Sequence, residues 1–164
     1  MKTDRNLSRL SILVGRHLLA CGQFLATAES CTGGWVAKAI TDIGGSSQWF
    51  AEGWVTYSNE SKHLRLGVPL SVLKRHGAVS EATVVAMARG ALARSGAQVA
   101  LSVSGIAGPG GGAEGKPVGT VWFAWAVRAG RRIRVRSERR RFRGDRAAVR
   151  LSAAIHAMKG VLKS

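Results

Sequence analysis

The sequence predicts an α/β protein, a single three-layer α/β/α domain with a mixed, mostly parallel sheet and one antiparallel hairpin. Strand-like apolar runs alternate with segments of helical periodicity, which is typical of a sheet covered by helices on both faces. Two strand-like runs flank a turn at 129–130, which predicts the hairpin. The 164 residues suffice for one hydrophobic core and are too few for two ordinary domains, so we expect one domain over 1–164.

The first half of the chain is expected to alternate helices and strands. Apolar residues recur at helical spacing from Leu7 to Leu18, and Gly22 then ends the first helix. The apolar run that follows is typical of a buried strand. Ser58 or Asn59 can cap a later short helix. The expected elements are a helix at 6–21, a strand at 24–27, a helix at 35–43, a strand at 53–57, and helices at 60–66 and 70–76.

The second half is expected to supply one long helix, a buried strand, the hairpin and a last helix. Ser80 can cap the long helix, and a loop rich in Gly and Pro fills 105–119. Ile133 and Val135 alternate with arginines, so one face of that strand is predicted to be wet or to contact an anion. The expected elements are a helix at 81–95, strands at 97–104, 120–127 and 132–142, and a helix at 145–162.

Positive charge is the oddest bulk feature of the chain. The net charge of +16 comes from 25 Lys and Arg against 9 Asp and Glu. A dense field of this kind attracts anions such as a nucleotide phosphate or a nucleic-acid backbone, but we interpret most of it as a solvated surface. The densest stretch contains Arg128, Arg131, Arg132, Arg134, Arg136, Arg139, Arg140, Arg141, Arg143, Arg146 and Arg150.

Several classes of protein are disfavoured by composition. No apolar run reaches the roughly 18 residues that span a bilayer, and no convincing signal-peptide cleavage site follows the N-terminus. We therefore expect a cytoplasmic protein without membrane contact. Cys21 and Cys31 make neither a disulfide framework nor a CxxC motif, and the four histidines are scattered. The sequence therefore predicts no metal site, and no cofactor is expected.

Ser30 lies in a polar turn, 29–34, between a predicted buried strand and a predicted helix. Backbone N–H groups at the start of that helix would point toward a ligand, and the helix dipole favours negative charge there. An exposed hydroxyl beside such donors has the geometry of a nucleophile with an oxyanion hole. A simple helix cap by Ser30 or Thr32 explains the local sequence at least as well. The candidate oxyanion or substrate-binding residues are Cys31, Thr32, Gly33 and Gly34.

A serine nucleophile needs a base, and no His or Asp partner is evident. Lys62 begins the helix after the next strand, and neighbouring strand ends meet at the ligand-binding edge of an α/β sheet. Tyr57 and Lys62 are therefore expected within reach of Ser30, although a solvated lysine paired with Glu60 is the simpler interpretation. A buried lysine can act as a base because desolvation favours its neutral form. Cys31 ranks second as nucleophile, since a thiol at a helix N-terminus is reactive but lacks a histidine partner.

Two more segments are candidates for the site. Ser104 and Gly105 end a predicted strand and open the glycine-rich loop, which could admit a nucleotide or could be a plain mobile loop. Asp145 fits the first turn of the last helix. Arg143 and Arg146 beside it could clamp a phosphate or could be solvated.

Six segments together resemble the CinA C-terminal domain family. They are TAESCTGG at 27–34, VTYSNE at 55–60, GAVS at 77–80, SGIAGP at 104–109, KPVGTV at 116–121 and GDR at 144–146. They occur in the family's order and span nearly the whole chain. The resemblance implies an α/β/α fold, no metal, and hydrolysis of the carboxamide of nicotinamide mononucleotide to nicotinic acid mononucleotide and ammonia.

The resemblance also implies roles for individual residues. Carried over one by one, Ser30 is the nucleophile, Lys62 the base, and Tyr57 and Arg146 supporting residues of the site. The turn at Ser104 forms part of the pocket wall. The resemblance further implies a homo-oligomer, a dimer or larger.

The alternative hypothesis is a basic nucleic-acid-binding or competence-associated accessory protein without amidase activity. It would use the arginine-rich stretch at 128–150. The Trp-rich segment at 121–125 is more typical of a core strand than of a stacking platform, and no helix-turn-helix or zinc-finger pattern is present. Amidohydrolysis of a small nucleotide is therefore the leading hypothesis, and nucleic-acid binding is not favoured.

Overall fold

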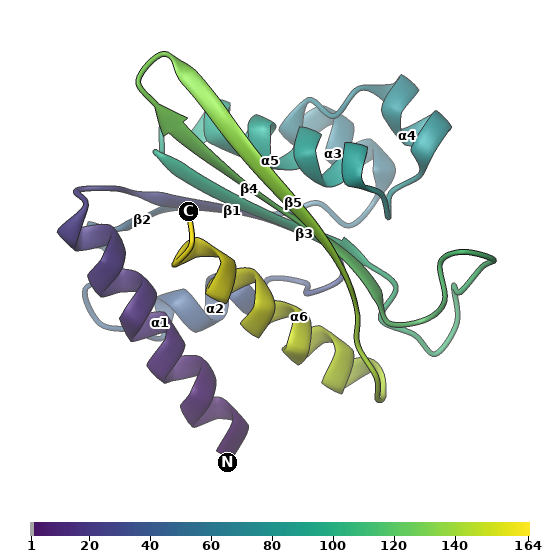
Figure 1. Ribbon diagram of the computed structural model, residues 1–164, viewed down its shortest axis with the longest axis horizontal. Helices are drawn as coiled ribbons and strands as arrows, with labels where there is room; N and C mark the ends of the chain where they lie inside the picture. Colours follow the sequence, from purple (N-terminus) through teal and green to yellow (C-terminus); the bar gives the residue numbers. More distant parts are fainter. Residues whose placement is uncertain (1) are drawn as a thin grey trace.

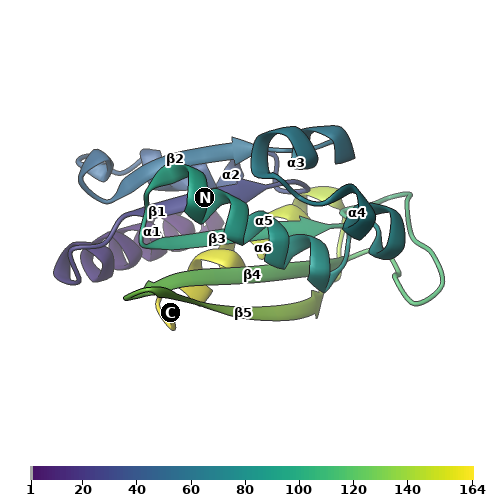
Figure 2. The ribbon, with the colours of Figure 1, turned by 90° about the horizontal axis from the view of Figure 1, so that it is seen from above.

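The computed structural model describes residues 2–164, with side chains from residue 6 onward, and is built on a five-stranded sheet. The strand order is β2-β1-β3-β4-β5 (Figure 2). β1 pairs in parallel with β2 and β3, whereas β3–β4 and β4–β5 are antiparallel, so only β4 opposes the others. The mixed sheet and its hairpin are confirmed. The strands are β1 Leu25–Glu29, β2 Phe50–Val55, β3 Val99–Gly105, β4 Thr120–Ala129 and β5 Arg132–Arg141.

Helices cover both faces of this sheet, which confirms the predicted three layers (Figure 1). The first face carries α1 Lys2–Ala20, α2 Trp35–Thr41 and α6 Arg146–Val161. The second face carries α3 Asn59–Leu66, α4 Leu70–His76 and α5 Glu81–Ser95. A single 3-10 turn, η1 Ser46–Gln48, lies in the predicted loop before β2.

The two hydrophobic clusters explain why the central strands are apolar on both sides. In β1, Leu25 packs in the cluster with α1, α2 and α6, while Ala26 and Ala28 pack in the cluster with α5. All five residues of β1 are buried. Strands covered on both faces are continuous apolar runs rather than alternating ones, and this strand follows that rule except for Thr27 and Glu29.

All five strands differ from the predicted ranges by one or more residues, and the differences at β1 and β2 concern the site. β1 runs on to Glu29, which pairs with Val55 of β2 and with Val103 of β3. A glutamate after an apolar run looks like the start of a turn, but pairing on both sides keeps it in the strand. β2 spans Phe50–Val55 rather than 53–57, because the chain leaves the sheet after Thr56 N–H donates to Glu29 O.

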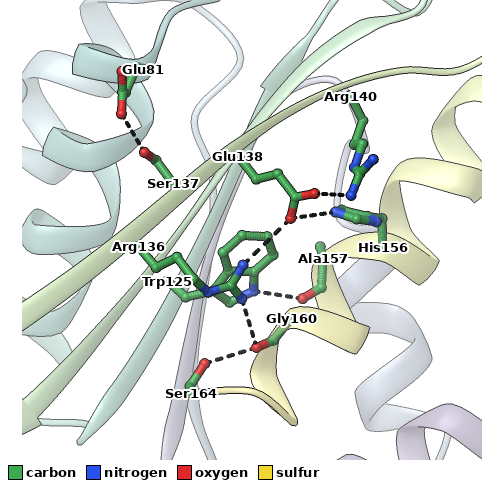
Figure 3. Close-up of polar contacts among 10 residues, drawn as sticks. All are labelled: Glu81, Trp125, Arg136, Ser137, Glu138, Arg140, His156, Ala157, Gly160 and Ser164. Carbon is green, nitrogen blue, oxygen red and sulfur yellow. Dashed lines mark hydrogen bonds and ion pairs between the residues drawn. The ribbon is translucent and has the colours of Figure 1, made fainter.

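α6 is fixed to the hairpin by polar contacts near its C-terminal end (Figure 3). Trp125 Nε1 donates to Ala157 O at 2.8 Å, and Arg136 donates to Gly160 O at 3.2 Å. The Arg136 guanidinium also lies 3.9 Å from the centroid of the Trp125 ring. Gly160 must lack a side chain, since a Cβ there would lie 2.0 Å from that ring. This docking brings the N-terminal end of α6 to the carboxyl edge of the sheet.

Candidate active site

The candidate site lies where the parallel strands β2, β1 and β3 end. Ser30 follows β1, Tyr57 comes two residues after β2, and Ser104 is near the end of β3. Carboxyl ends of parallel strands form the usual ligand-binding edge of an α/β sheet. A hollow of about 270 Å³ opens there. Its wall includes Ser30, Cys31, Tyr57, Ala78, Val79, Ser104, Gly105, Arg146 and several residues of the loop at 106–111.

Lys62 reaches Ser30 across this edge. Its Nζ lies 3.0 Å from Ser30 Oγ, and it also donates to the carbonyl oxygens of Thr56, at 2.7 Å, and Tyr57, at 3.2 Å. Ser58 caps α3 by accepting from the N–H of Ser61, so the lysine sits on the first turn of a well-formed helix. Its side chain is fully buried, which excludes the solvated lysine considered from the sequence.

The surroundings of Lys62 favour a neutral amine. Burial lowers the pKa of Lys62 to about 8, because a charged ammonium loses its hydration there, and the neighbouring Cys31 offsets this only in part. A neutral amine has two hydrogens and one lone pair. With the carbonyls of Thr56 and Tyr57 accepting the hydrogens, the lone pair is directed at Ser30 Oγ. This arrangement suits an amine that removes the hydroxyl proton.

The turn that carries Ser30 occupies the N–H groups of Gly33 and Gly34 internally. Gly33 N–H donates to Ser30 O, and Gly34 N–H donates to the carboxylate of Glu29. The predicted oxyanion donors at Gly33 and Gly34 are therefore already occupied. In the part of the chain that the structure describes, no carbonyl or carboxylate accepts the N–H of Cys31 or Thr32. Of these two residues, Cys31 borders the hollow, whereas Thr32 is buried behind it.

Cys31 is buried beside Ser30 and is a poor nucleophile. Burial is the main cause that raises the pKa of its thiol to about 12, so the thiolate is not populated near neutral pH. The second-ranked nucleophile of the sequence analysis is thus disfavoured by its surroundings. Its side chain is part of the hydrophobic cluster under α2 and α6.

Arg146, Tyr57 and the glycine-rich loop form the rim of the hollow. Arg146 donates to Tyr57 Oη at 3.0 Å and to Gly108 O at 2.8 Å, so it joins the end of β2 to the loop. The Tyr57 side chain is exposed at this rim. Ser104 is buried in the wall, and its hydroxyl donates to Ala78 O at 2.8 Å, which holds the 77–80 segment against β3.

Two residues at the site were missed by sequence reasoning. Glu29 is completely buried, and its carboxylate accepts three N–H groups from the start of α2. An acidic residue near a helix N-terminus is a recognisable signal, but its five-residue offset from the helix obscured it. Arg150 donates to Cys31 O at 3.1 Å and to Thr32 O at 2.9 Å. It was hidden among many arginines of the same stretch.

The remaining arginines of that stretch have varied surroundings. Arg128 donates to Leu92 O and Ala97 O at the end of α5. Arg136 and Arg140 pair with Glu138, which also contacts His156 (Figure 3). The others, exposed on β5 or beside it, line the edge of the sheet, where charge discourages pairing with another chain. These are Arg131, Arg132, Arg134, Arg139, Arg141 and Arg143.

The Trp-rich segment of β4 is core, as predicted. Val121 and Phe123 are fully buried and Trp125 nearly so. Among the described residues, no group of three or more His, Cys, Asp or Glu side chains is placed to hold a metal ion. No helix within residues 2–164 is both long and apolar enough to cross a membrane.

Comparison with known proteins places this geometry in a family. The model of the CinA C-terminal domain matches residues 7–164. The nicotinamide-nucleotide amidohydrolase PncC of Escherichia coli K12 is 57% identical over 157 residues, covering 96% of this chain and 93% of that protein. The PncC protein of Pseudomonas putida is 52% identical over 157 residues, with 96% of each chain covered.

Solved structures agree with the sequence matches. A CinA superfamily protein from Klebsiella pneumoniae 700603 superposes with a TM-score of 0.90 at 42% identity, covering 96% of both chains. A competence/damage inducible protein from Agrobacterium tumefaciens gives a TM-score of 0.89 at 40% identity, covering 97% of this chain and 96% of that one. On the family match, the sequence relatives and the shared fold, this chain belongs to the CinA C-terminal domain family.

Proposed function

We propose that this protein is a nicotinamide-nucleotide amidohydrolase. It hydrolyses the carboxamide of nicotinamide mononucleotide to a carboxylate, releasing ammonia and nicotinic acid mononucleotide. The observation that carries this proposal is the buried contact of 3.0 Å between Lys62 Nζ and the Oγ of Ser30, a residue in the wall of the hollow. Relatives more than half identical, which are named for the same activity, support it.

The first half of the reaction acylates Ser30. Neutral Lys62 accepts the hydroxyl proton while Ser30 Oγ forms a bond to the amide carbon, whose oxygen becomes an oxyanion. The N–H groups of Cys31 and Thr32 stabilise that oxyanion, since they are the free donors next to the nucleophile. The C–N bond then breaks, Lys62 returns its proton to the nitrogen, and ammonia leaves a nicotinoyl ester on Ser30.

The second half reverses these roles with water. Lys62 accepts a proton from water while the water oxygen attacks the ester carbon. Collapse of the second oxyanion breaks the bond to Ser30 Oγ, which takes the proton back from Lys62. Overall, one amide and one water give one carboxylic acid and one ammonia, and the site returns to its starting state without a metal or cofactor.

The rim of the hollow accounts for recognition of a nucleotide. Arg146 is a charged donor at the rim, held between Tyr57 and Gly108, where it can meet the phosphate. The exposed ring of Tyr57 offers an apolar face to the pyridine ring. The glycines of the loop at 108–111 leave room for the ribose.

Ammonia release from nicotinamide mononucleotide tests the proposal directly. The purified protein is incubated with the nucleotide, and ammonia and nicotinic acid mononucleotide are measured together. We expect equal molar amounts of both products. A nucleoside without the phosphate serves as the matched control and is expected to react more slowly, because Arg146 then has no anion to bind. Absence of either product from the full nucleotide contradicts the proposal.

The pKa of Lys62 sets the pH dependence of this activity. Below about pH 8 the amine is protonated and cannot accept a proton. We therefore expect kcat/KM to rise by about tenfold per pH unit below pH 8 and to level off above it. Steady-state ammonia release at constant ionic strength measures the profile. If kcat/KM keeps rising up to pH 10.5, the ordinary pKa of a lysine, Lys62 is not the desolvated base.

We also propose that the whole activity belongs to one domain, because α3, which carries Lys62, and α6, which carries Arg146, pack on opposite faces of one sheet. Assembly into a homo-oligomer and a cytoplasmic location stay predictions from the sequence.

A further inference from the structure

We propose that Glu29 and Arg150 are a pair of positioning residues that hold the turn at 30–34, the nucleophile turn, from two sides. They thereby keep the N–H groups of Cys31 and Thr32 free for the oxyanion. Neither residue borders the hollow, and neither is part of the Ser30–Lys62 pair. The inference rests on the proposed function, because it assigns these residues to the same reaction.

Glu29 fixes the N–H side of the turn. Its Oε2 accepts from Gly34 N at 3.0 Å and Val36 N at 3.1 Å, and its Oε1 accepts from Ala37 N at 2.8 Å. These are donors at the start of α2, which are left free by the helix itself. A fully buried carboxylate needs such partners, and here it joins the last residue of β1 directly to α2 across the turn. Ser30 is the residue next to this anchor.

Arg150 fixes the carbonyl side of the same turn. Its Nε and Nη2 donate to the carbonyl oxygens of Cys31 and Thr32, at 3.1 and 2.9 Å. In a trans peptide the C=O and the following N–H point in opposite directions. A Cys31 carbonyl turned toward Arg150 therefore turns the N–H of Thr32 away from it. The Thr32 carbonyl also faces Arg150, so the N–H of Gly33 points the opposite way. There it donates to Ser30 O.

The space around Gly33 shows how closely the guanidinium lies against the turn. A Cβ at Gly33 would be 3.1 Å from Arg150 Nη2, and the φ of +61° at this residue is one that glycine adopts readily. Arg150 comes from α6, more than a hundred residues away in the chain, and its guanidinium also faces the Trp35 ring at 5.4 Å. The turn is thus held by α2 through Glu29 and by α6 through Arg150.

A purely structural role for Arg150 would be to hold α6 in place. α6 has other attachments at its opposite end, from Trp125 to Ala157 and from Arg136 to Gly160. Loss of the Arg150 side chain therefore leaves the helix docked and releases only the two carbonyls. The expected consequence is a slower chemical step with substrate binding retained.

Arg150→Ala tests the carbonyl side. We expect kcat to fall by about 100-fold with KM little changed, because a small misplacement of the turn weakens the transition state and not the bound nucleotide. Arg150 borders a surface hollow with Gly33 and Gly34, so free guanidinium can enter the vacated place and is expected to restore part of kcat. Arg150→Lys is expected to recover less than added guanidinium, since an ammonium cannot make both bonds in the same plane.

Arg89→Ala is the matched control, because Arg89 is exposed on α5. It is expected to keep the activity of the unchanged protein and to gain nothing from guanidinium. A fall in thermal stability of Arg150→Ala with full kcat in the folded fraction would overturn the proposal, as would a rise in KM without a fall in kcat. Failure of guanidinium to raise kcat above the effect in the control would also overturn it.

Glu29→Gln tests the N–H side without changing the size of the side chain. One oxygen becomes an NH₂ group that faces backbone donors, so at least one N–H loses its acceptor. We expect a fall in kcat of about 10- to 100-fold, again with KM little changed. Glu52→Gln, on exposed β2, is the control and is expected to have no effect. Full kcat in folded Glu29→Gln would contradict the role of Glu29.

Covalent labelling separates this inference from the proposed substrate. Phenylmethylsulfonyl fluoride reports the reactivity of the serine toward a tetrahedral sulfonyl centre and needs no nucleotide recognition. We expect labelling at Ser30, found by peptide mass spectrometry, and slower labelling in Arg150→Ala and Glu29→Gln than in the two control variants. A protein that labels at Ser30 without hydrolysing the nucleotide refutes the proposed function alone. Equal labelling rates in all four variants refute the positioning pair alone.

Discussion

Ser30→Ala is expected to reduce ammonia release by about 10⁴-fold or more, the scale at which enzymes lose a covalent nucleophile. The alanine keeps the turn and removes only the oxygen that bonds to the amide carbon. Because Ser30 lies at the end of β1 with its N–H donating to Val103 O, the backbone should stay in place. Steady-state ammonia release gives the rate, and intact-protein mass spectrometry after rapid acid quenching should find the nicotinoyl ester only when Ser30 is present.

Ser71→Ala provides the matched control for this experiment, because Ser71 is exposed on α4 and lies outside the hollow. It is expected to keep full activity. Undiminished turnover by Ser30→Ala would remove Ser30 as the nucleophile. Turnover by the unchanged protein with no ester at any time, under conditions in which ester breakdown is slowed, would instead argue for direct attack by water.

Lys62→Met is the second substitution with a large expected effect, a fall in kcat of about 10³- to 10⁴-fold. Methionine has a similar length and is apolar, so it fits the buried space but cannot take the proton from Ser30 Oγ. The rise of activity through pH 8 should disappear from whatever rate remains. Lys74→Met, an exposed position on α4, is the control and should leave the rate unchanged.

Stability gives an independent check on the same lysine. The folded-state pKa of Lys62 is lowered from 10.5 to about 8, so between these values the unfolded chain binds more protons than the folded one. The free energy of unfolding should therefore rise with pH across this window by more in the unchanged protein than in Lys62→Met. Below about pH 8 the lysine is protonated in both states and its contribution no longer varies. Denaturant titrations at several pH values measure the difference, and identical pH slopes would show an unperturbed lysine.

Ser30 and Lys62 also show how far the sequence could lead. Either residue alone had an ordinary explanation, a helix cap or a solvated lysine. Their pairing depends on β1 and β2 being parallel neighbours, so that the residues after both strands emerge at the same edge. The order of the elements predicted that proximity. The burial that lowers the pKa of Lys62 comes from packing, and packing is not visible in the residues next to it.

Glu29 and the glycines show where local inference failed. Gly33 and Gly34 look like open oxyanion donors in the sequence, yet the folded turn uses both N–H groups internally. Glu29 looks like a turn residue, yet the strands on both sides keep it in β1. For Gly34 and Glu29 the deciding partner lies on another element, while the N–H of Gly33 donates to Ser30 O only because the folded chain gives the turn that conformation.

Local pattern in the chain was sufficient for the three-layer fold, for nearly every helix and strand, and for Ser30 and Lys62 as candidates. Periodicity and capping are properties of neighbouring residues, which is why α5 was predicted with its observed bounds, Glu81–Ser95. Only the folded chain decided which N–H groups of the turn after β1 lack an acceptor, which arginine of the basic stretch reaches that turn, and that Lys62 is desolvated. Those outcomes depend on contacts between distant segments, such as Arg150 with Cys31 and Thr32, and burial arises only when the segments have packed.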